Sequence, residues 1–248
     1  MDFRGQVAVV TGASSGLGRR LALDLGAQGA DVIALARRED RLRELGCDYR
    51  VLDLADTPGY VELLGAIEKD RGRIDVLLNV AGIGGVVRTE PADLDVTREV
   101  LEVNFFSPYA GMLAVLPGMC ERRYGVIANM SSDDARAPGP GAGDYPASKA
   151  ALSAATESLS YAVRADGVAL HVIYPGWVPT EMGTYAVEHG GMSMPPRPAR
   201  RTEEQVSSLV LRRLGGPRVE INCATLPLVA PMVRTFAPRL YHRMRASR

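Results

Sequence analysis

A glycine-rich turn near the start of the chain restricts the possible folds most strongly. The apolar run Val7–Val10 leads into Thr11-Gly12-Ala13-Ser14-Ser15-Gly16-Leu17-Gly18, and a helical pattern follows over Leu17–Gln28. Glycines at a strand–helix junction let the backbone approach a pyrophosphate, which the helix N-terminus attracts. A second strand-like run follows at Asp31–Leu35. A glycine-rich turn indicates dinucleotide binding only when it lies between a strand and a helix in such a unit. The segment therefore predicts a strand–turn–helix–strand unit that binds a dinucleotide.

Short apolar runs alternate with longer helical segments along the chain, which indicates parallel strands joined by crossover helices. We predict an α/β fold of the Rossmann type, with a doubly wound parallel sheet of about seven strands. No linker or internal repeat divides residues 1–248, so we expect a single domain. Separate helices are predicted at 93–104 and 108–122. The predicted strands are Val7–Val10, Asp31–Leu35, Tyr49–Leu52, Ile74–Leu78, Val126–Asn129, Val168–Ile173 and Val219–Cys223.

A tyrosine and a lysine four residues apart carry the clearest chemical signal. Tyr145 and Lys149 lie in Gly-Asp-Tyr-Pro-Ala-Ser-Lys-Ala, and Ser132 precedes the tyrosine by thirteen positions. On a helix, residues four apart share one face. A tyrosine ordinarily ionises near pH ~10, and an ammonium about 4 Å away can lower that pKa by roughly three units. The pair predicts a phenol that acts as general acid or base near neutral pH.

The rarity of lysine supports a special role for Lys149. Lysine and arginine together number 29, but only Lys69 and Lys149 are lysines. A compact ammonium fits between a phenol and a sugar hydroxyl better than a planar guanidinium does. We therefore expect Lys149 to occupy a position that arginine could not fill.

Five motifs occur in an order that resembles the classical short-chain dehydrogenase/reductase family. They are the Gly-x-x-x-Gly-x-Gly spacing that begins at Gly12, Asn79-Val80-Ala81-Gly82, Ser132, Tyr145-x-x-x-Lys149 and Pro175-Gly176. The resemblance extends from about Gly5 to Thr180. The combination is far more specific than any single motif, and it implies an oxidoreductase that uses a nicotinamide cofactor.

The resemblance implies where this dinucleotide would bind. The glycines would shape the turn around the pyrophosphate, and Asp53 would contact the adenine unless it serves only a turn. Residues after the fourth strand would line the adenosine, and residues after Pro175-Gly176 would meet the nicotinamide carboxamide. The implied set is Gly12, Ser14, Ser15, Gly16, Leu17, Gly18, Asp53, Leu54, Asn79, Ala81, Gly82, Tyr145, Lys149, Pro175, Gly176, Val178 and Thr180.

The same resemblance assigns catalytic roles. Tyr145 would give a proton to a carbonyl oxygen, and Ser132 would orient that oxygen by a hydrogen bond. Lys149 would bind the nicotinamide ribose and lower the pKa of the tyrosine. Asn104 matches the family asparagine that holds a water behind the lysine, with a helix kink or cap as its structural alternative. Ser131 competes with Ser132, but the spacing to the tyrosine selects Ser132.

These roles predict hydride transfer between a nicotinamide cofactor and a ketone or secondary alcohol. We favour NADPH-dependent reduction of a ketone, or the reverse reaction, on a lipophilic small molecule. One alternative is an NAD-dependent alcohol dehydrogenase that works oxidatively. Another is a catalytically idle dinucleotide-binding scaffold or sensor, which loss of Tyr145 or Lys149 would have favoured; both residues are present.

The end of the second strand predicts which dinucleotide binds. An acidic side chain there binds the ribose 2′-hydroxyl of NAD, whereas an arginine accommodates the 2′-phosphate of NADP. This chain reads Ala36-Arg37-Arg38, with alanine at the usual acidic position. We therefore expect Arg37 to pair with the phosphate and Arg38 to be a weaker second partner. NADP(H) is favoured over NAD(H).

Substrate-binding residues are predicted only coarsely. Residues 180–214 are expected to form a lid, because they follow the nicotinamide contact. We expect it to be irregular to about Arg201 and helical from an N-cap at Thr202 to about Leu214. Methionines at 182, 192 and 194 and Tyr185 favour a lipophilic ketone. Asp133 and Asp134 follow the serine where small or apolar residues are usual in the family. They either touch a polar group of the substrate or face water.

Composition excludes other classes of protein. A formal net charge of zero gives no general attraction to nucleic acid. The three cysteines have no metal or redox spacing, which suits a reducing compartment, and the three histidines are dispersed, so we predict no metal site. We find no signal-peptide pattern and no uncharged run approaching the ~20 residues of a bilayer span. A cytoplasmic location is therefore expected.

The last segment, residues 224–248, combines basic and apolar side chains. No acidic residue follows Glu220, whereas arginines recur to the end. Such segments can lie on an anionic membrane surface. We favour the alternative that this segment packs over the substrate pocket or a partner subunit. The family usually forms dimers or tetramers, so the resemblance also implies a homo-oligomer.

Overall fold

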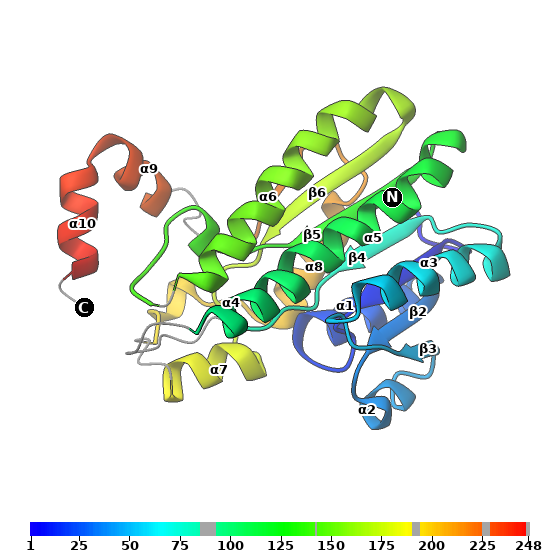
Figure 1. Cartoon of the computed structure of the whole chain (residues 1–248), viewed down its shortest axis with the longest axis horizontal. Helices are drawn as coiled ribbons and strands as arrows, with labels where there is room; N and C mark the ends of the chain where they lie inside the picture. The colour runs from blue at the N-terminus through cyan, green and yellow to red at the C-terminus, as the bar shows by residue number, and fades with distance from the viewer. Residues whose placement is uncertain (85–92, 142, 190–193, 225–228, 247–248) are drawn as a thin grey trace.

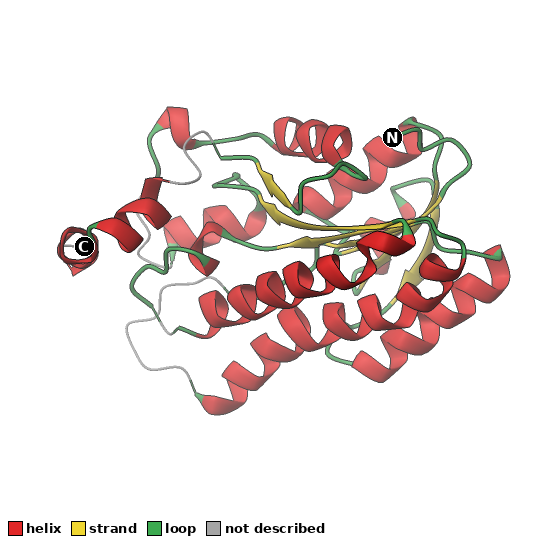
Figure 2. Cartoon of the chain, turned by 90° about the horizontal axis from the view of Figure 1, so that it is seen from above, coloured by secondary structure: helices red, strands yellow, loops and turns green. Residues whose placement is uncertain are grey.

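The predicted strands form one parallel sheet in the order β3-β2-β1-β4-β5-β6-β7, with helices on both faces (Figures 1 and 2). The computed structural model describes residues 1–84, 93–141, 143–189, 194–224 and 229–246. The strands are β1 (Val7–Thr11), β2 (Asp31–Ala36), β3 (Asp48–Val51), β4 (Val76–Asn79), β5 (Gly125–Met130), β6 (Val168–Tyr174) and β7 (Glu220–Asn222). The α-helices are α1 (Gly16–Ala27), α2 (Glu39–Arg43), α3 (Thr57–Arg71), α4 (Leu94–Leu101), α5 (Ser107–Glu121), α6 (Asp144–Val163), α7 (Glu181–Glu188), α8 (Glu203–Arg213), α9 (Val229–Phe236) and α10 (Pro238–Ala246).

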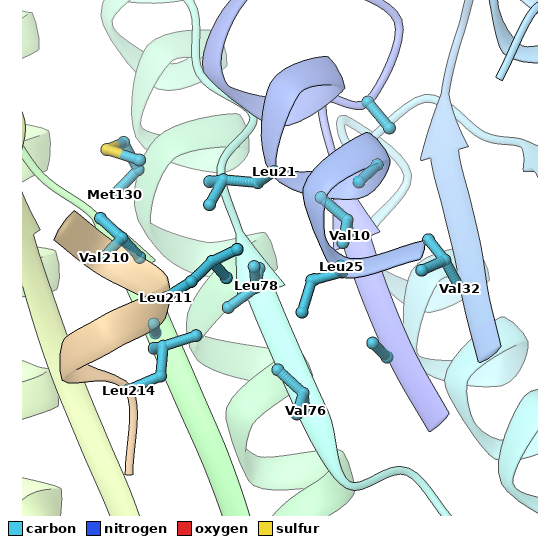
Figure 3. Packing of buried hydrophobic residues seen from close by; sticks show 14 of the residues in the cluster. Val10, Leu21, Leu25, Val32, Val76, Leu78, Met130, Val210, Leu211 and Leu214 are labelled. Carbon is cyan, nitrogen blue, oxygen red and sulfur yellow. The ribbon is translucent and has the colours of Figure 1, made fainter. Parts of the chain in front are cut away.

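The central strands are apolar along their length because both faces of the sheet are covered. Every residue of β1, β4 and β5 is buried. One core cluster lies under α1 and α8, and a second lies under α3, α5 and α6. Figure 3 shows Leu21 and Leu25 of α1 close to Leu211 of α8, over the side chains of β1 and β4. This packing fixes the sheet edge where the loops meet.

The strand order reverses direction between β1 and β4, which are hydrogen-bonded neighbours. At such a switch point the loops after the two strands diverge to opposite faces and leave a crevice at the carboxyl edge of the sheet. The glycine turn follows β1, and Val80 begins the loop after β4. The topology therefore brings together motifs that are about seventy residues apart in the sequence.

The two helices predicted at 93–104 and 108–122 form one continuous run, which is a correction. A π-helical turn at Glu102–Phe106 joins α4 to α5 directly before Pro108, whose ring and missing N–H disfavour a regular helix. By length and composition alone, Leu94–Glu121 could cross a membrane, contrary to our expectation. Half of its most apolar window is buried in this fold, however, so it is weak evidence for a span.

The predicted lid is wrong in two respects. It is not irregular throughout, because Thr180 accepts a hydrogen bond from the Gly183 N–H and so starts α7. It also ends earlier than residue 214, because α8 packs on α1 within the core. The N-cap predicted at Thr202 is confirmed, and Gln205 completes a capping box with it. The lid methionine at 192 lies outside the described residues.

The C-terminal segment folds into α9 and α10 and projects from one end of the molecule (Figure 1). It is held by three hydrogen bonds to one loop: Arg234 to the Arg136 carbonyl (2.7 Å), Arg245 to that of Ala137 (2.9 Å) and Tyr241 to that of Pro138 (2.6 Å). None of its described residues lines the cavity, and the alternative that the segment packs on a partner subunit stays a prediction. The segment braces the loop that follows Asp134.

Candidate active site

The loops at the carboxyl edge of the sheet surround a cavity of about 660 Å³. It is lined by the turns after β1, β2, β4, β5 and β6 and by residues of α6 and α7. The predicted site residues found in its wall are Gly12, Ser14, Ser15, Gly16, Leu17, Gly18, Arg37, Arg38, Asp53, Leu54, Ala81, Gly82, Ser132, Tyr145, Lys149, Pro175, Gly176, Val178 and Thr180. Asn79 and Asn104 lie outside the wall, so the fold gathers the rest at one place.

The glycine turn is packed too closely for side chains. A Cβ on Gly18 would lie 2.3 Å from the Gly12 carbonyl oxygen, and one on Gly12 would lie 2.8 Å from the Ala81 backbone. Thr11 Oγ1 accepts the N–H groups of Val80 (3.0 Å) and Ala81 (3.2 Å), which fixes the loop after β4 against the turn. This bare backbone cradle at the start of α1 fits the pyrophosphate of a dinucleotide.

Asn79 does not contribute to the cavity wall, which corrects its predicted position beside the adenosine. Its side chain is buried, and it donates to Asn129 Oδ1 (2.8 Å) and accepts from the Tyr60 hydroxyl (2.7 Å). Because a buried amide needs such partners, the motif asparagine here ties β4 to β5 and α3.

Arg38, rather than Arg37, reaches the glycine turn. Its guanidinium donates to Ser14 Oγ (3.2 Å) and Ser15 Oγ (2.6 Å). The Arg37 side chain is 63% exposed and pairs with Asp53 at 3.4 Å. In this structure Arg38 thus lies between the turn and the end of β2, whereas Arg37 pairs with Asp53, and the ranking of the two arginines as phosphate partners stays a prediction.

Glu181 and Trp177 are two polar wall residues that were missed from the sequence. Glu181, the first residue of α7, forms ion pairs with Arg38 (3.0 Å) and Arg41, and so links the lid helix to the arginines. The arginines lower the pKa of its carboxyl. Trp177 follows the Pro-Gly motif, and its indole N–H is buried without a partner among the described residues. An acidic residue after an N-cap threonine was the available signal for Glu181.

Ser132, Tyr145 and Lys149 line the same cavity as the arginines. Ser132 caps a short 3₁₀ turn, where its Oγ accepts the Asp134 N–H at 3.2 Å. Its hydroxyl also acts on Tyr145, whose pKa it lowers. Ser131 points elsewhere: its hydroxyl bonds Ser153 at 2.6 Å. The serine chosen by spacing is thus the one beside the tyrosine.

The prediction that Lys149 lowers the pKa of Tyr145 is wrong for this structure. Burial raises the pKa of Tyr145 to about 12; the Ser132 hydroxyl lowers it, and the charges of Asp134 and Asp133 raise it. Burial also lowers the pKa of Lys149 to about 8. The lysine Nζ lies 5.9 Å from the Tyr145 ring centroid and donates to the Met130 carbonyl at 2.9 Å. Burial of the phenol therefore affects its pKa more than the attraction expected from the lysine ammonium.

Asn104 occupies the π-helical turn between α4 and α5. Its amide accepts the Ile83 N–H (2.9 Å) and donates to the Ile83 carbonyl (2.9 Å) and to Ser148 Oγ (3.0 Å). A Cβ on Gly82 would meet Asn104 Oδ1 at 3.2 Å and Lys149 Nζ at 3.0 Å, so both groups crowd this glycine. The structural alternative is thus present, and the water-holding role stays a prediction.

Comparison with known proteins agrees with this geometry. The short chain dehydrogenase family model matches residues 6–190. A short chain dehydrogenase of Pseudocercospora fijiensis is 37% identical over 73% of this chain, which spans 62% of that protein. The dehydrogenase/reductase SDR family member 7B of Bos taurus is 34% identical over 99% of this chain and 82% of its own length.

Solved structures share the whole fold. A short-chain dehydrogenase from Streptomyces avermitilis aligns with a TM-score of 0.84 at 25% identity, over 100% of this chain and 98% of that one. A variant of actinorhodin polyketide ketoreductase, solved with NADPH, aligns with a TM-score of 0.80 at 28% identity, over 90% of this chain and 97% of that one. The sheet, the glycine cradle, the matched family model and these relatives agree that the chain belongs to the short-chain dehydrogenase/reductase family of oxidoreductases.

Proposed function

We propose that this protein catalyses the NADPH-dependent reduction of a ketone to a secondary alcohol on a lipophilic small molecule, with the reverse reaction available. The observation that carries the proposal is one cavity with a pyrophosphate cradle and a serine–tyrosine pair beside a buried lysine. A scaffold or sensor protein would have no need of this second group. The likeness to a ketoreductase solved with NADPH supports the same reaction.

The residues present fit a nicotinamide dinucleotide. Gly12, Gly16 and Gly18 would hold the pyrophosphate, and Asp53 the adenine end. Val178 and Thr180 would hold the nicotinamide carboxamide. The bound cofactor would supply the hydride to the carbonyl carbon, or accept it from the alcohol.

The tyrosine suits the acid role in ketone reduction. Because burial raises its pKa to about 12, Tyr145 remains protonated throughout the neutral range and can donate that proton to the developing alkoxide. Ser132 can act as a second donor to the same oxygen. The N–H of Asp134 uses only a lone pair of its hydroxyl oxygen, so the hydroxyl hydrogen remains available. Lys149 would hold the nicotinamide ribose and can replace the proton that the tyrosine loses. A tyrosine that stays protonated favours reduction over oxidation near neutral pH.

The lid supports a lipophilic substrate. Met182 and Ala186 of α7 line the cavity, and Met182, Tyr185 and Met194 remain 38%, 52% and 47% exposed. Partly exposed apolar side chains around a cavity mouth are typical of a site that closes on an apolar ligand.

The exposed Phe106 and Leu113 on the α4–α5 run support our further proposal of a homodimer or homotetramer.

The direct test is ketone-dependent oxidation of NADPH by the purified protein. We expect the absorbance of reduced nicotinamide to fall when a panel of medium-chain and cyclic ketones is added, and a titration to show tighter binding of NADPH than of NADH. A protein that binds NADPH but consumes it with no ketone or alcohol pair would contradict the proposed reaction. Tighter binding of NADH would contradict the cofactor assignment alone.

Replacing Arg38 by aspartate should weaken NADPH binding by about ten- to a hundredfold, because it removes a charge-assisted bond and adds a like charge. The affinity for NADH should change much less, since NADH has no 2′-phosphate. Arg37→Asp is the matched control from the neighbouring, more exposed position, and we expect a smaller effect there. Equal losses for both cofactors in the Arg38 variant would show that Arg38 does not recognise the phosphate.

A further inference from the structure

Two carboxylates stand beside the proposed acid. Asp133 and Asp134 form the 3₁₀ turn that follows Ser132, and both line the cavity. Their charges reach the phenol, because both raise the pKa of Tyr145. A pair of acids next to a group that must donate a proton is electrostatically unfavourable unless it serves another contact.

Asp133 has an unused acceptor. Its Oδ1 is buried and has no hydrogen-bond partner among the described residues. The charge of Arg136 lowers the pKa of Asp133 against the effect of burial, but the guanidinium makes its close contacts elsewhere, and its Nη2 forms an ion pair rather than a hydrogen bond. The guanidinium pairs with Glu220 at 2.6 Å, donates to Asn222 Oδ1 at 2.6 Å and lies 3.2 Å from the centre of the Tyr174 ring. A buried carboxylate oxygen without a partner is costly, so the position calls for a donor from outside the chain.

Asp134 is in a different situation, although it is the adjacent residue. The charge of Arg245, on the C-terminal helix α10, acts on it and lowers its pKa against the raising effect of burial. Arg245 is itself anchored to the Ala137 carbonyl at 2.9 Å. Each carboxylate thus has one countercharge, Arg245 for Asp134 and Arg136 for Asp133, and both line the cavity. The two differ because Asp133 has a buried oxygen without a hydrogen-bond partner among the described residues. Burial raises the pKa of Asp133 as well, which fits a carboxylate short of donors.

We propose that Asp133 is a specificity-determining residue that accepts a hydrogen bond from a hydroxyl group one or two carbons from the carbonyl of the substrate. The preferred substrates are then hydroxyketones, with a polar head at Asp133 and an apolar remainder under Met182 and α7. This inference rests on the proposed ketone reduction and names its substrate class. The position directly after Ser132 sets the short distance between carbonyl and hydroxyl. We assign no substrate contact to the indole N–H of Trp177, which lies in the segment expected to meet the cofactor.

The test compares each hydroxyketone with its methyl ether, using 1-hydroxy-2-octanone and 4-hydroxy-2-octanone. The ether keeps the carbonyl, the chain and the oxygen but cannot donate. With NADPH, we expect wild-type kcat/KM for at least one hydroxyketone to exceed that of its ether by about tenfold or more, the value of a bond to a charged acceptor. Equal values for both pairs would overturn the inference and leave the reductase proposal intact. No consumption of NADPH with any of the four ketones would contradict the reductase proposal itself.

The variants assign any preference to one residue. In Asp133→Ala the ratio of hydroxyketone to ether should fall to about one, and in Asp133→Asn, which keeps an acceptor oxygen without charge, it should fall only partly. Asp134→Ala is the matched control and should keep the wild-type ratio. The ratio is insensitive to general damage, which lowers both rates together, and NADPH binding checks that each variant is folded. A ratio unchanged in Asp133→Ala, or lost equally in Asp134→Ala, would overturn the assignment.

Discussion

Replacing Tyr145 by phenylalanine is expected to reduce turnover by a factor of about 10² or more while NADPH still binds. The change removes one hydroxyl from a side chain that lines the cavity, and general acid catalysis by a placed side chain contributes about 10²–10⁴ in rate. The phenol stays protonated near neutrality, so it is a proton donor that the cavity offers to a carbonyl oxygen. Single-turnover reduction of a ketone and fluorescence titration of NADPH separate the two effects.

The same helix supplies a control for this result. Tyr161→Phe removes a hydroxyl from a side chain that is 65% exposed and bonds only Glu157 among the described residues, at 2.7 Å. Its turnover should stay within a few-fold of wild type. If Tyr145→Phe also stays within a few-fold, the proton must come from another group. If it loses NADPH binding and turnover together, the tyrosine acts mainly in holding the cofactor.

The pH profile distinguishes the two reaction directions. Reduction needs the phenol protonated, and with a pKa of about 12 that form predominates throughout the neutral range, so Tyr145 should cause no fall in rate there. Oxidation needs the phenolate, whose small population grows as pH rises. The alcohol-to-ketone rate should therefore increase with pH, whereas ketone reduction should not.

The parts of the site that the sequence predicted correctly are those fixed by local geometry. The glycine turn could be placed because the backbone, not a neighbouring side chain, makes the cradle. Tyr145 and Lys149 could be paired because residues four apart on α6 share a face. The strand pattern predicted the sheet because buried parallel strands are apolar on both faces.

The parts that failed depend on tertiary packing. The pKa of Tyr145 is set by burial and by aspartates that meet it only in the folded chain. Asn79 carries the expected motif, but partners from α3 and β5 engage its amide. Sequence could not show that Arg38 rather than Arg37 reaches the serines after β1, because two adjacent arginines look alike, and which of them binds a 2′-phosphate stays a prediction.

Replacing Lys149 by methionine should impair function and yet stabilise the fold. Turnover should fall strongly, and the Kd of NADPH should rise about tenfold, since the proposed ribose contact is lost. The lysine is 3% exposed, and burial lowers its pKa to about 8 from the ordinary value of 10.5. Holding its charge at neutral pH therefore costs about 3 kcal/mol. The lost bond to the Met130 carbonyl offsets about 1 kcal/mol, so the unfolding free energy at pH 7 should rise by about 2 kcal/mol.

The sign of the pH dependence makes this prediction specific. Between pH 8 and 10.5 the unfolded chain binds a proton that the folded chain lacks, so wild-type stability gains with rising pH in that window. Methionine cannot titrate, and its advantage in urea unfolding should therefore shrink between pH 7 and pH 9.5. Lys69→Met, at the other lysine of the chain and on an exposed position, should change neither stability nor its pH dependence. The contrary result is a Lys149→Met protein that is less stable than wild type at pH 7, or one whose gain in unfolding free energy does not vary with pH. Either result would show that the folded protein does not lose stability by keeping the buried amine charged. The lysine would then be retained for the fold as much as for the reaction.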